Sequence, residues 1–157
     1  MTRLYGRAPA GHRVHEATPQ SHWKVVTLIG ALRLSGMVAP MTVEAATDGQ
    51  IFLAYVEYFL CPVLRPDDVV VMDNLSAHKV DGIAQLIETT GAKLLYLPPY
   101  SPDLNSIEKA WSKIKQILRA IKARSTETLD QAITEALHHI TPDNARAWFR
   151  LCKSSLQ

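Results

Sequence analysis

The chain has only two cysteines in 157 residues, Cys61 and Cys152, and they lie far apart. Because no CxxC pair occurs, the sequence argues against a disulfide framework or a structural zinc site, and it fits a reducing compartment. There is no run of about 18 or more apolar residues, so no membrane-spanning helix is expected. No apolar segment follows Met1 to mark a secretory signal. We therefore expect a cytoplasmic protein that has no membrane partner.

Several common functional signatures are also missing. GxGxxG, GxxxxGK[ST] and GxSxG do not occur, which removes the commoner nucleotide-binding and acyl-transfer hypotheses. Histidines occur as His12-x-x-His15 and His138-His139, but no cysteine or carboxylate cluster accompanies them. A zinc site is therefore not expected at either pair.

The basic residues are unevenly spread along a chain whose net charge is only +2. Residues 1–40 hold five basic residues against one acid, and Arg7 and Arg13 lie in the irregular arm formed by residues 1–22. The second block, 109–124, has no acid at all and contains Lys109, Lys113, Lys115, Arg119, Lys122 and Arg124. Such blocks suggest a docking surface for a polyanion, although a solvated helix face is the simpler explanation of a charge run alone.

The pattern of apolar residues and turn signals predicts a single α/β domain. Two strands joined by a turn at Ser35-Gly36 are expected, followed by a helix that Asp48 caps and Pro62 ends. Two apolar runs then predict parallel strands buried on both faces, with a helix ended by Gly91 between them. The expected strands are 23–34, 38–45, 68–72 and 93–97, and the expected helices are 49–60, 80–90, 106–122, 128–140 and 144–152.

Asp73 and Asn74 directly follow the third predicted strand, Asp68–Met72. Ligands of α/β proteins bind at the carboxyl ends of parallel strands, so the position of Asp73 favours a functional role. The alternative is a turn in which the aspartate side chain caps nearby backbone N–H groups. His78 lies five residues further on, where it could reach the same crevice or serve as an ordinary structural histidine.

Glu108 begins an amphipathic helix, with 34 residues between it and Asp73. Asn105 and Glu108 fit a capping box, which is the structural alternative to a catalytic glutamate. Glu108 also begins a stripe that continues with Ser112, Lys115, Arg119 and Lys122, beside an apolar stripe of Ile107, Trp111, Ile114, Leu118 and Ile121. A nucleic-acid backbone could therefore follow these cations while one phosphate is held at the carboxylate.

These segments resemble a mariner-like DDE transposase of the bacterial insertion-sequence branch. The resemblance rests on Met72-Asp73-Asn74 with Ala77-His78-Lys79, and on the run from Leu97 through Asn105 (LPPYSPDLN) into Ile107-Glu108. Tyr5–Pro9 and Trp23-Lys24 are similar to the same branch, so nearly the whole chain is covered. Ser106 departs from the proline that is usual there, and serine is tolerable at that position.

The resemblance implies a ribonuclease H-like fold and a catalytic triad in which Asp73 is the second member and Glu108 the third. Two Mg²⁺ or Mn²⁺ ions would be held there, one activating the attacking oxygen and one stabilising the leaving oxygen. Asn74, His78 and Asn105 would support the site. The implied partners are transposon ends and target DNA, bound by a homodimer that is associated with the nucleoid.

The first aspartate of the triad has no counterpart in this sequence. In the family it lies on a central first strand, upstream of the segment that matches residues 1–11, and the helix-turn-helix is missing too. We therefore expect a truncated copy or a misplaced start codon, with two unpaired strand edges that another segment or chain would complete. The alternatives are an inactive remnant that binds DNA through its basic helix, and a ribonuclease H-like nuclease unrelated to transposition.

Overall fold

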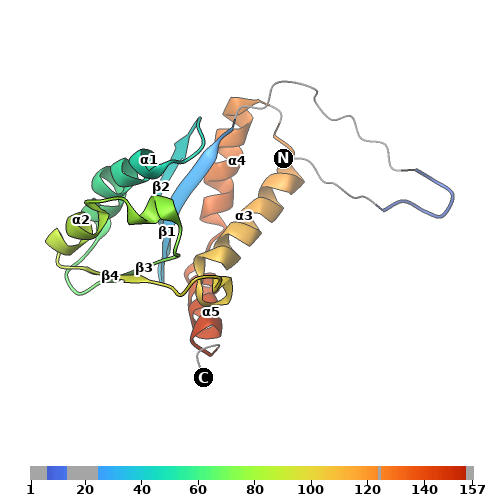
Figure 1. Ribbon diagram of the computed structural model, residues 1–157. Coiled ribbons are helices and arrows are strands. Elements are labelled where there is room, and N and C mark those ends of the chain that lie inside the picture. Colours follow the sequence, from blue (N-terminus) through green and yellow to red (C-terminus); the bar gives the residue numbers. More distant parts are fainter. Residues whose placement is uncertain (1–6, 14–24, 124, 155–157) are drawn as a thin grey trace.

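The computed structural model describes residues 7–13, 25–123 and 125–154 (Figure 1). Strand β1 (Thr27–Arg33) and strand β2 (Gly36–Val43) form an antiparallel hairpin. Gly36 has φ of 119° directly after the turn, a backbone conformation that glycine adopts without strain. The predicted hairpin is therefore confirmed, although β1 is shorter than predicted and β2 begins and ends two residues earlier than predicted. Trp23, Lys24 and most of the predicted arm lie outside the described residues.

Helix α1 (Gly49–Tyr55) follows the hairpin and begins where the sequence predicted. Asp48 is its N-cap, and its carboxylate accepts hydrogen bonds from the backbone N–H groups of Gln50 and Ile51. The helix continues as a π-helical turn (Val56–Leu60) and a 3₁₀ turn (Cys61–Val63) that contains Pro62. Proline lacks the N–H that further turns would need, so the helix ends there.

Strands β3 (Val69–Met72) and β4 (Lys93–Tyr96) pair in parallel and are connected by helix α2 (Ile83–Thr89). Gly91, with φ of 83°, turns the chain from α2 into β4. Among the described strands, β1 pairs only with β2 and β3 only with β4. The expected mixed sheet therefore exists as two separate pairs, and the outer edge of each strand is unpaired among the described residues.

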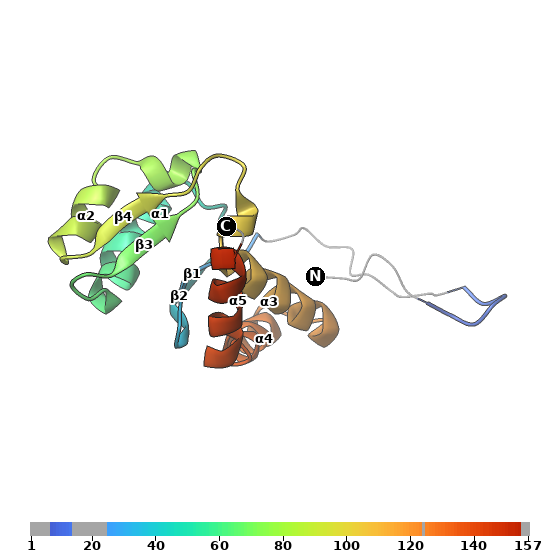
Figure 2. The same cartoon turned by 90° about the horizontal axis from the view of Figure 1, so that it is seen from below.

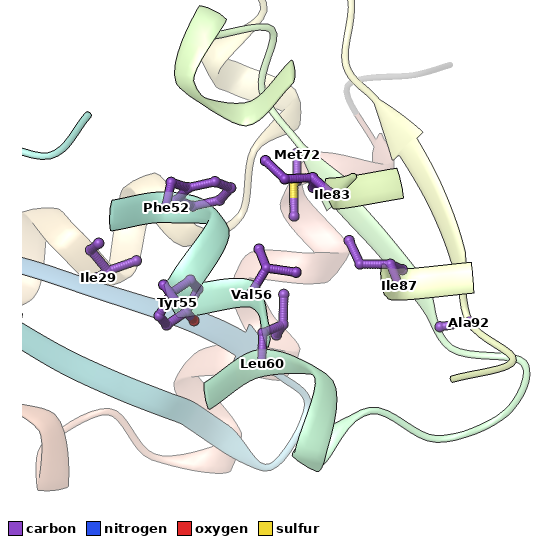
Figure 3. Close-up of a cluster of buried hydrophobic side chains, with 9 residues drawn as sticks. All are labelled: Ile29, Phe52, Tyr55, Val56, Leu60, Met72, Ile83, Ile87 and Ala92. Atoms are coloured by element: carbon purple, nitrogen blue, oxygen red, sulfur yellow. The ribbon is translucent and has the colours of Figure 1, made fainter. Parts of the chain in front are cut away.

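Two apolar cores lie on opposite faces of the hairpin. The first packs α1, α2 and the β3–β4 pair against Ile29, and Figure 3 shows its buried side chains. The second packs the C-terminal helices against Leu28 and Leu32. Neighbouring residues of one strand point to opposite faces, so β1 contributes to both cores. Figures 1 and 2 both place α1 and α2 on one side of the hairpin and α3, α4 and α5 on the other.

The expectation that β3 and β4 are buried on both faces is wrong. Val69, Val71 and Leu95 are 56%, 45% and 53% exposed. Val70 and Met72 face the first core instead, because α1 and α2 both pack on that face of the pair. None of the described elements buries the opposite face, so it presents apolar side chains to solvent.

The three C-terminal helices are α3 (Ile107–Ile121), α4 (Thr126–His138) and α5 (Pro142–Ser154). Each lies within a few residues of its predicted position. The buried stripe of α3 differs from the prediction, because Ala110 is fully buried whereas Ile121 is 39% exposed. No helix among the described residues is long and apolar enough to cross a membrane.

Candidate functional site

Asp73 directly follows β3, at the carboxyl end of the parallel pair. Its Oδ1 accepts a hydrogen bond from the backbone N–H of Leu75 at 3.3 Å, which is the local turn cap that sequence analysis offered as the alternative role. The side chain is nevertheless 38% exposed. The cap therefore uses one carboxylate oxygen and does not remove Asp73 from solvent.

His78 contacts the same carboxylate. It lies in a 3₁₀ turn (Ser76–Lys79), and its Nδ1 is 2.6 Å from Oδ1 of Asp73. The two groups are within ion-pair distance, although their alignment is not that of a well-directed hydrogen bond. The structure thus joins two residues that the sequence had only placed near one another.

Two aromatic residues that sequence analysis did not single out hold His78 in place. The ring of Phe52 lies 4.1 Å from the imidazole, centroid to centroid, and the hydroxyl of Tyr96 donates to the backbone carbonyl of His78 at 2.7 Å. Burial raises the pKa of Tyr96, so the phenol remains a donor. Tyr96 could have been noticed in the sequence because it is an aromatic residue near the end of a predicted strand. Nothing in the sequence distinguishes Phe52 from other core residues.

Asn74 has a side-chain oxygen that is buried and without a hydrogen-bond partner among the described residues. A buried amide oxygen without a partner costs free energy of about 1–3 kcal/mol. Asn74 directly follows Asp73 in the sequence, but because this oxygen is shielded from solvent, a ligand could use it only after its surroundings rearrange.

The connector after β4 remains close to Asp73 as it begins. The backbone N–H of Leu97 donates to the carbonyl of Met72 at 2.8 Å, which extends the β3–β4 pairing by one bond. Tyr100 is fully exposed and has φ of 57°, a conformation that is strained for a bulky residue. A 3₁₀ turn (Pro102–Leu104) then leads into α3.

Glu108 lies in the first turn of α3, but the predicted capping box is absent. Ser106 is the N-cap, no side chain caps the helix, and Asn105 contributes only its backbone carbonyl, which accepts from the N–H of Glu108. Asn105 is thus a turn residue because the helical backbone begins one residue later than predicted. Glu108 is exposed, and its carboxylate has no partner among the described residues. The structural role that sequence analysis weighed against catalysis is therefore not realised.

The two carboxylates suit a divalent cation only in part. No group of three or more histidine, cysteine, aspartate or glutamate side chains gathers at one point among the described residues. Oδ2 of Asp73, the amide oxygen of Asn74 and the carboxylate of Glu108 are hard oxygen ligands that have no partner within the part of the chain that the structure describes, and Mg²⁺ prefers ligands of this type. These side chains therefore supply the type of oxygen ligand that such an ion binds. They are too few to complete its coordination, so further ligands are needed.

The predicted DNA-contacting cations fall into three groups. Lys109, Lys115 and Arg119 are exposed along α3, and Arg7 and Arg13 are exposed in the described part of the arm. Lys113 instead donates to the carbonyl of His139 at 2.8 Å and to Oδ1 of Asn144 at 2.6 Å, so it ties α3 to the α4–α5 junction. Lys122 is partly buried and ends α3 with φ of 56°.

Solved structures similar in fold to this chain include two of one transposase. The Mos1 strand transfer complex matches with a TM-score of 0.74 and 17% sequence identity, covering 98% of this chain and 48% of that one. The Mos1 transposase paired-end complex with the left transposon end matches at 0.68 and 15%, covering 98% and 47%. The chain thus spans about half the length of these structures, and the likeness shows a ribonuclease H-like fold.

No curated protein sequence matches the chain significantly. The family model described as DDE superfamily endonuclease matches residues 1–130, which include the β3–Asp73 segment, the connector and Glu108. The chain therefore belongs to the DDE superfamily endonucleases.

Proposed function

We propose that this chain is the catalytic portion of an insertion-sequence transposase that cleaves and transfers DNA strands with a divalent metal ion. The observation that carries the proposal is the pair of carboxylates, Asp73 at the carboxyl end of β3 and the exposed Glu108 in the first turn of α3. Family membership supports it, because DDE superfamily endonucleases generally use divalent metals.

Asp73 and Glu108 would hold Mg²⁺ or Mn²⁺ as two members of a triad, and the ions would supply activation of an attacking oxygen and stabilisation of a leaving one. The residues of the chain would orient the DNA. Lys115 and Arg119, four residues apart, share an exposed basic stripe on α3 along which a phosphate backbone can lie, and Lys109 is exposed near the start of the same helix. The two Mos1 structures are described as transposon-end and strand-transfer complexes, which supports DNA ends as the partner.

The unpaired edges of β1 and β3 suggest what completes the site. A further strand could pair with both edges and bring the first aspartate next to Asp73. We propose that an upstream-encoded segment or a partner copy supplies this strand, and that the working protein is a homodimer with a helix-turn-helix. The chain by itself is then not expected to cleave DNA.

The competing function is a catalytically inactive remnant that binds DNA through α3. It is favoured by the lack of a third acid near Asp73 and Glu108 among the described residues. The two functions differ in what they require of the carboxylates, since only the enzyme needs them to bind metal.

Binding of Mn²⁺ to the 157-residue chain, followed by the electron paramagnetic resonance of free Mn²⁺, tests the proposal. Asp73→Asn and Glu108→Gln should each weaken binding by at least about tenfold. Glu88→Gln, which makes the same change on the exposed face of α2, should leave it unaltered. Equal Mn²⁺ binding by all four proteins would favour the remnant. Plasmid nicking by a protein extended upstream, lost in Asp73→Asn, would establish the activity.

A further inference from the structure

Lys79 lies over the ring of Tyr96 at the carboxyl end of the β3–β4 pair. Its Nζ is 5.7 Å from the centroid of the ring, which is within the range of a cation–π contact. Tyr96 is the last residue of β4, and it pairs with Met72, the residue directly before Asp73. The ammonium group is therefore held at the sheet edge that carries Asp73.

The 3₁₀ turn that ends with Lys79 is attached to Tyr96 through its last two residues. The hydroxyl of Tyr96 donates to the backbone carbonyl of His78 at 2.7 Å, and the face of the same ring lies under the ammonium group of Lys79. These two contacts fix the backbone from which the lysine side chain starts and the ring on which it ends. The charge is thus positioned before any ligand arrives.

The ammonium group of Lys79 has no acidic partner. The residue is exposed, and none of the ion pairs among the described residues includes it. A contact with a ring face leaves the N–H donors of lysine able to bind phosphate oxygens. Asp73 by itself repels the phosphates of DNA, and a cation at the same edge offsets that repulsion.

We propose that Lys79 binds a phosphate of the DNA strand that lies at the carboxyl end of β3. This inference rests on the proposed function, in which DNA is the substrate. It extends the DNA-contacting surface from α3 to the edge of the sheet, where no cation had been assigned a role. The competing explanation is that Lys79 only covers the ring of Tyr96, in which case its charge makes no difference to DNA binding.

Three substitutions separate these explanations. Lys79→Met keeps an apolar stem to cover the ring and removes the charge, whereas Lys79→Arg keeps the charge. Lys93→Met is the matched control, because Lys93 is an exposed lysine at the opposite end of the same strand. A general loss of positive charge would affect DNA binding equally in Lys79→Met and Lys93→Met.

Binding of a fluorescein-labelled duplex oligonucleotide to the 157-residue chain is followed by anisotropy at several salt concentrations, with EDTA present so that metal binding does not contribute. Lys79→Met should weaken binding by about three- to tenfold at low salt and reduce the slope of log affinity against log salt concentration by about one. Lys79→Arg should keep the wild-type slope and remain within about threefold of the wild-type affinity. Lys93→Met should leave both quantities unaltered. Thermal unfolding establishes that each variant is folded.

Different outcomes would overturn different claims. If a folded Lys79→Met chain keeps the wild-type slope and affinity, the phosphate contact is disproved and the proposed function still stands. Equal losses in Lys79→Met and Lys93→Met would also disprove it, because the effect would then come from net charge. If the wild-type chain binds no duplex DNA, the DNA-binding part of the proposed function fails, and this inference fails with it.

Discussion

Arg33 and Asp68 form an ion pair that joins the last residue of β1 to the residue immediately before β3. Nη2 of Arg33 also donates to the carbonyl of Val63 at 2.9 Å, and Oδ2 of Asp68 accepts from the backbone N–H of Arg65 at 2.7 Å. Since no strand pairing connects the two sheets among the described residues, this cluster links them at one end.

Arg33→Ala should therefore lower the free energy of unfolding by about 1–2 kcal/mol, because two hydrogen bonds of a partly buried charged group are lost. Urea denaturation measures the change. Arg65→Ala is the matched control, since only the backbone of Arg65 takes part in the cluster, and it should shift stability by less than about 0.5 kcal/mol. Equal losses in the two variants would show that the link contributes nothing specific.

The cations of α3 should divide into DNA-contacting and structural residues. Lys115→Ala should weaken binding to duplex DNA of any sequence and reduce the slope of log affinity against log salt concentration by about one. Lys113→Met should lower stability instead, because it removes the side-chain donor to the carbonyl of His139 and the shorter of the two hydrogen bonds that Oδ1 of Asn144 accepts, and it should preserve the salt slope. Fluorescence anisotropy at several salt concentrations provides both slopes. If the salt slope fell only in Lys113→Met, then Lys113 would be the DNA-contacting residue and Lys115 would not.

Tyr55 carries a buried hydroxyl that has no partner among the described residues. Tyr55→Phe should therefore leave stability at neutral pH unchanged or raise it, since no hydrogen bond is lost and a desolvated polar group is removed. Burial also raises the pKa of Tyr55 above its ordinary value of 10.0. Above that pH the unfolded chain ionises first, so stability falls as pH rises, and this fall should be smaller in Tyr55→Phe.

Urea denaturation at neutral pH and above pH 10 checks both parts of this expectation. Tyr58→Phe is the control, because Tyr58 is 67% exposed. This substitution should change neither the stability at neutral pH nor the fall in stability above pH 10 appreciably. A clear loss of stability in Tyr55→Phe at neutral pH would mean that the hydroxyl has a partner in solution.

Local signals in the sequence predicted the order and type of the elements. Some of these signals act through backbone geometry that does not depend on distant contacts. They are Asp48 before α1, Pro62 after it and Gly91 before β4, and the structure confirms the predicted role of each as a helix start, a helix end or a turn. The position of Asp73 at a strand end was predictable for the same reason. The family resemblance, based on the residues around Asp73 and Glu108, is confirmed by the family match.

The rest depends on tertiary packing that a single sequence does not specify. Asn105 and Glu108 have the spacing of a capping box, but the N-cap of α3 is Ser106, one residue later than predicted, so Asn105 does not occupy the N-cap position that the box requires. Lys113 has the same charge pattern as its neighbours and differs only in reaching the α4–α5 junction. A run such as Val69–Met72 reads as doubly buried because its apolar residues do not alternate, yet burial requires an element on each face.

The exposed face of the β3–β4 pair gives the last prediction. Val71 points away from the first core and Val70 points into it, so the same substitution at adjacent positions compares the two faces. Val71→Thr should change the free energy of unfolding by less than about 0.5 kcal/mol, because threonine retains strand propensity and its hydroxyl stays in water. Val70→Thr should cost about 1–2 kcal/mol, since it places a hydroxyl against an apolar core.

Self-association would change this comparison in a recognisable way. If a second copy covers the exposed face, Val71→Thr becomes costly at high protein concentration and remains nearly neutral at low concentration, because binding stabilises the folded state by mass action. Sedimentation velocity at the same concentrations reports the oligomer directly. An equal cost of Val71→Thr and Val70→Thr in a demonstrated monomer would contradict the open face and require that a segment of the same chain covers it.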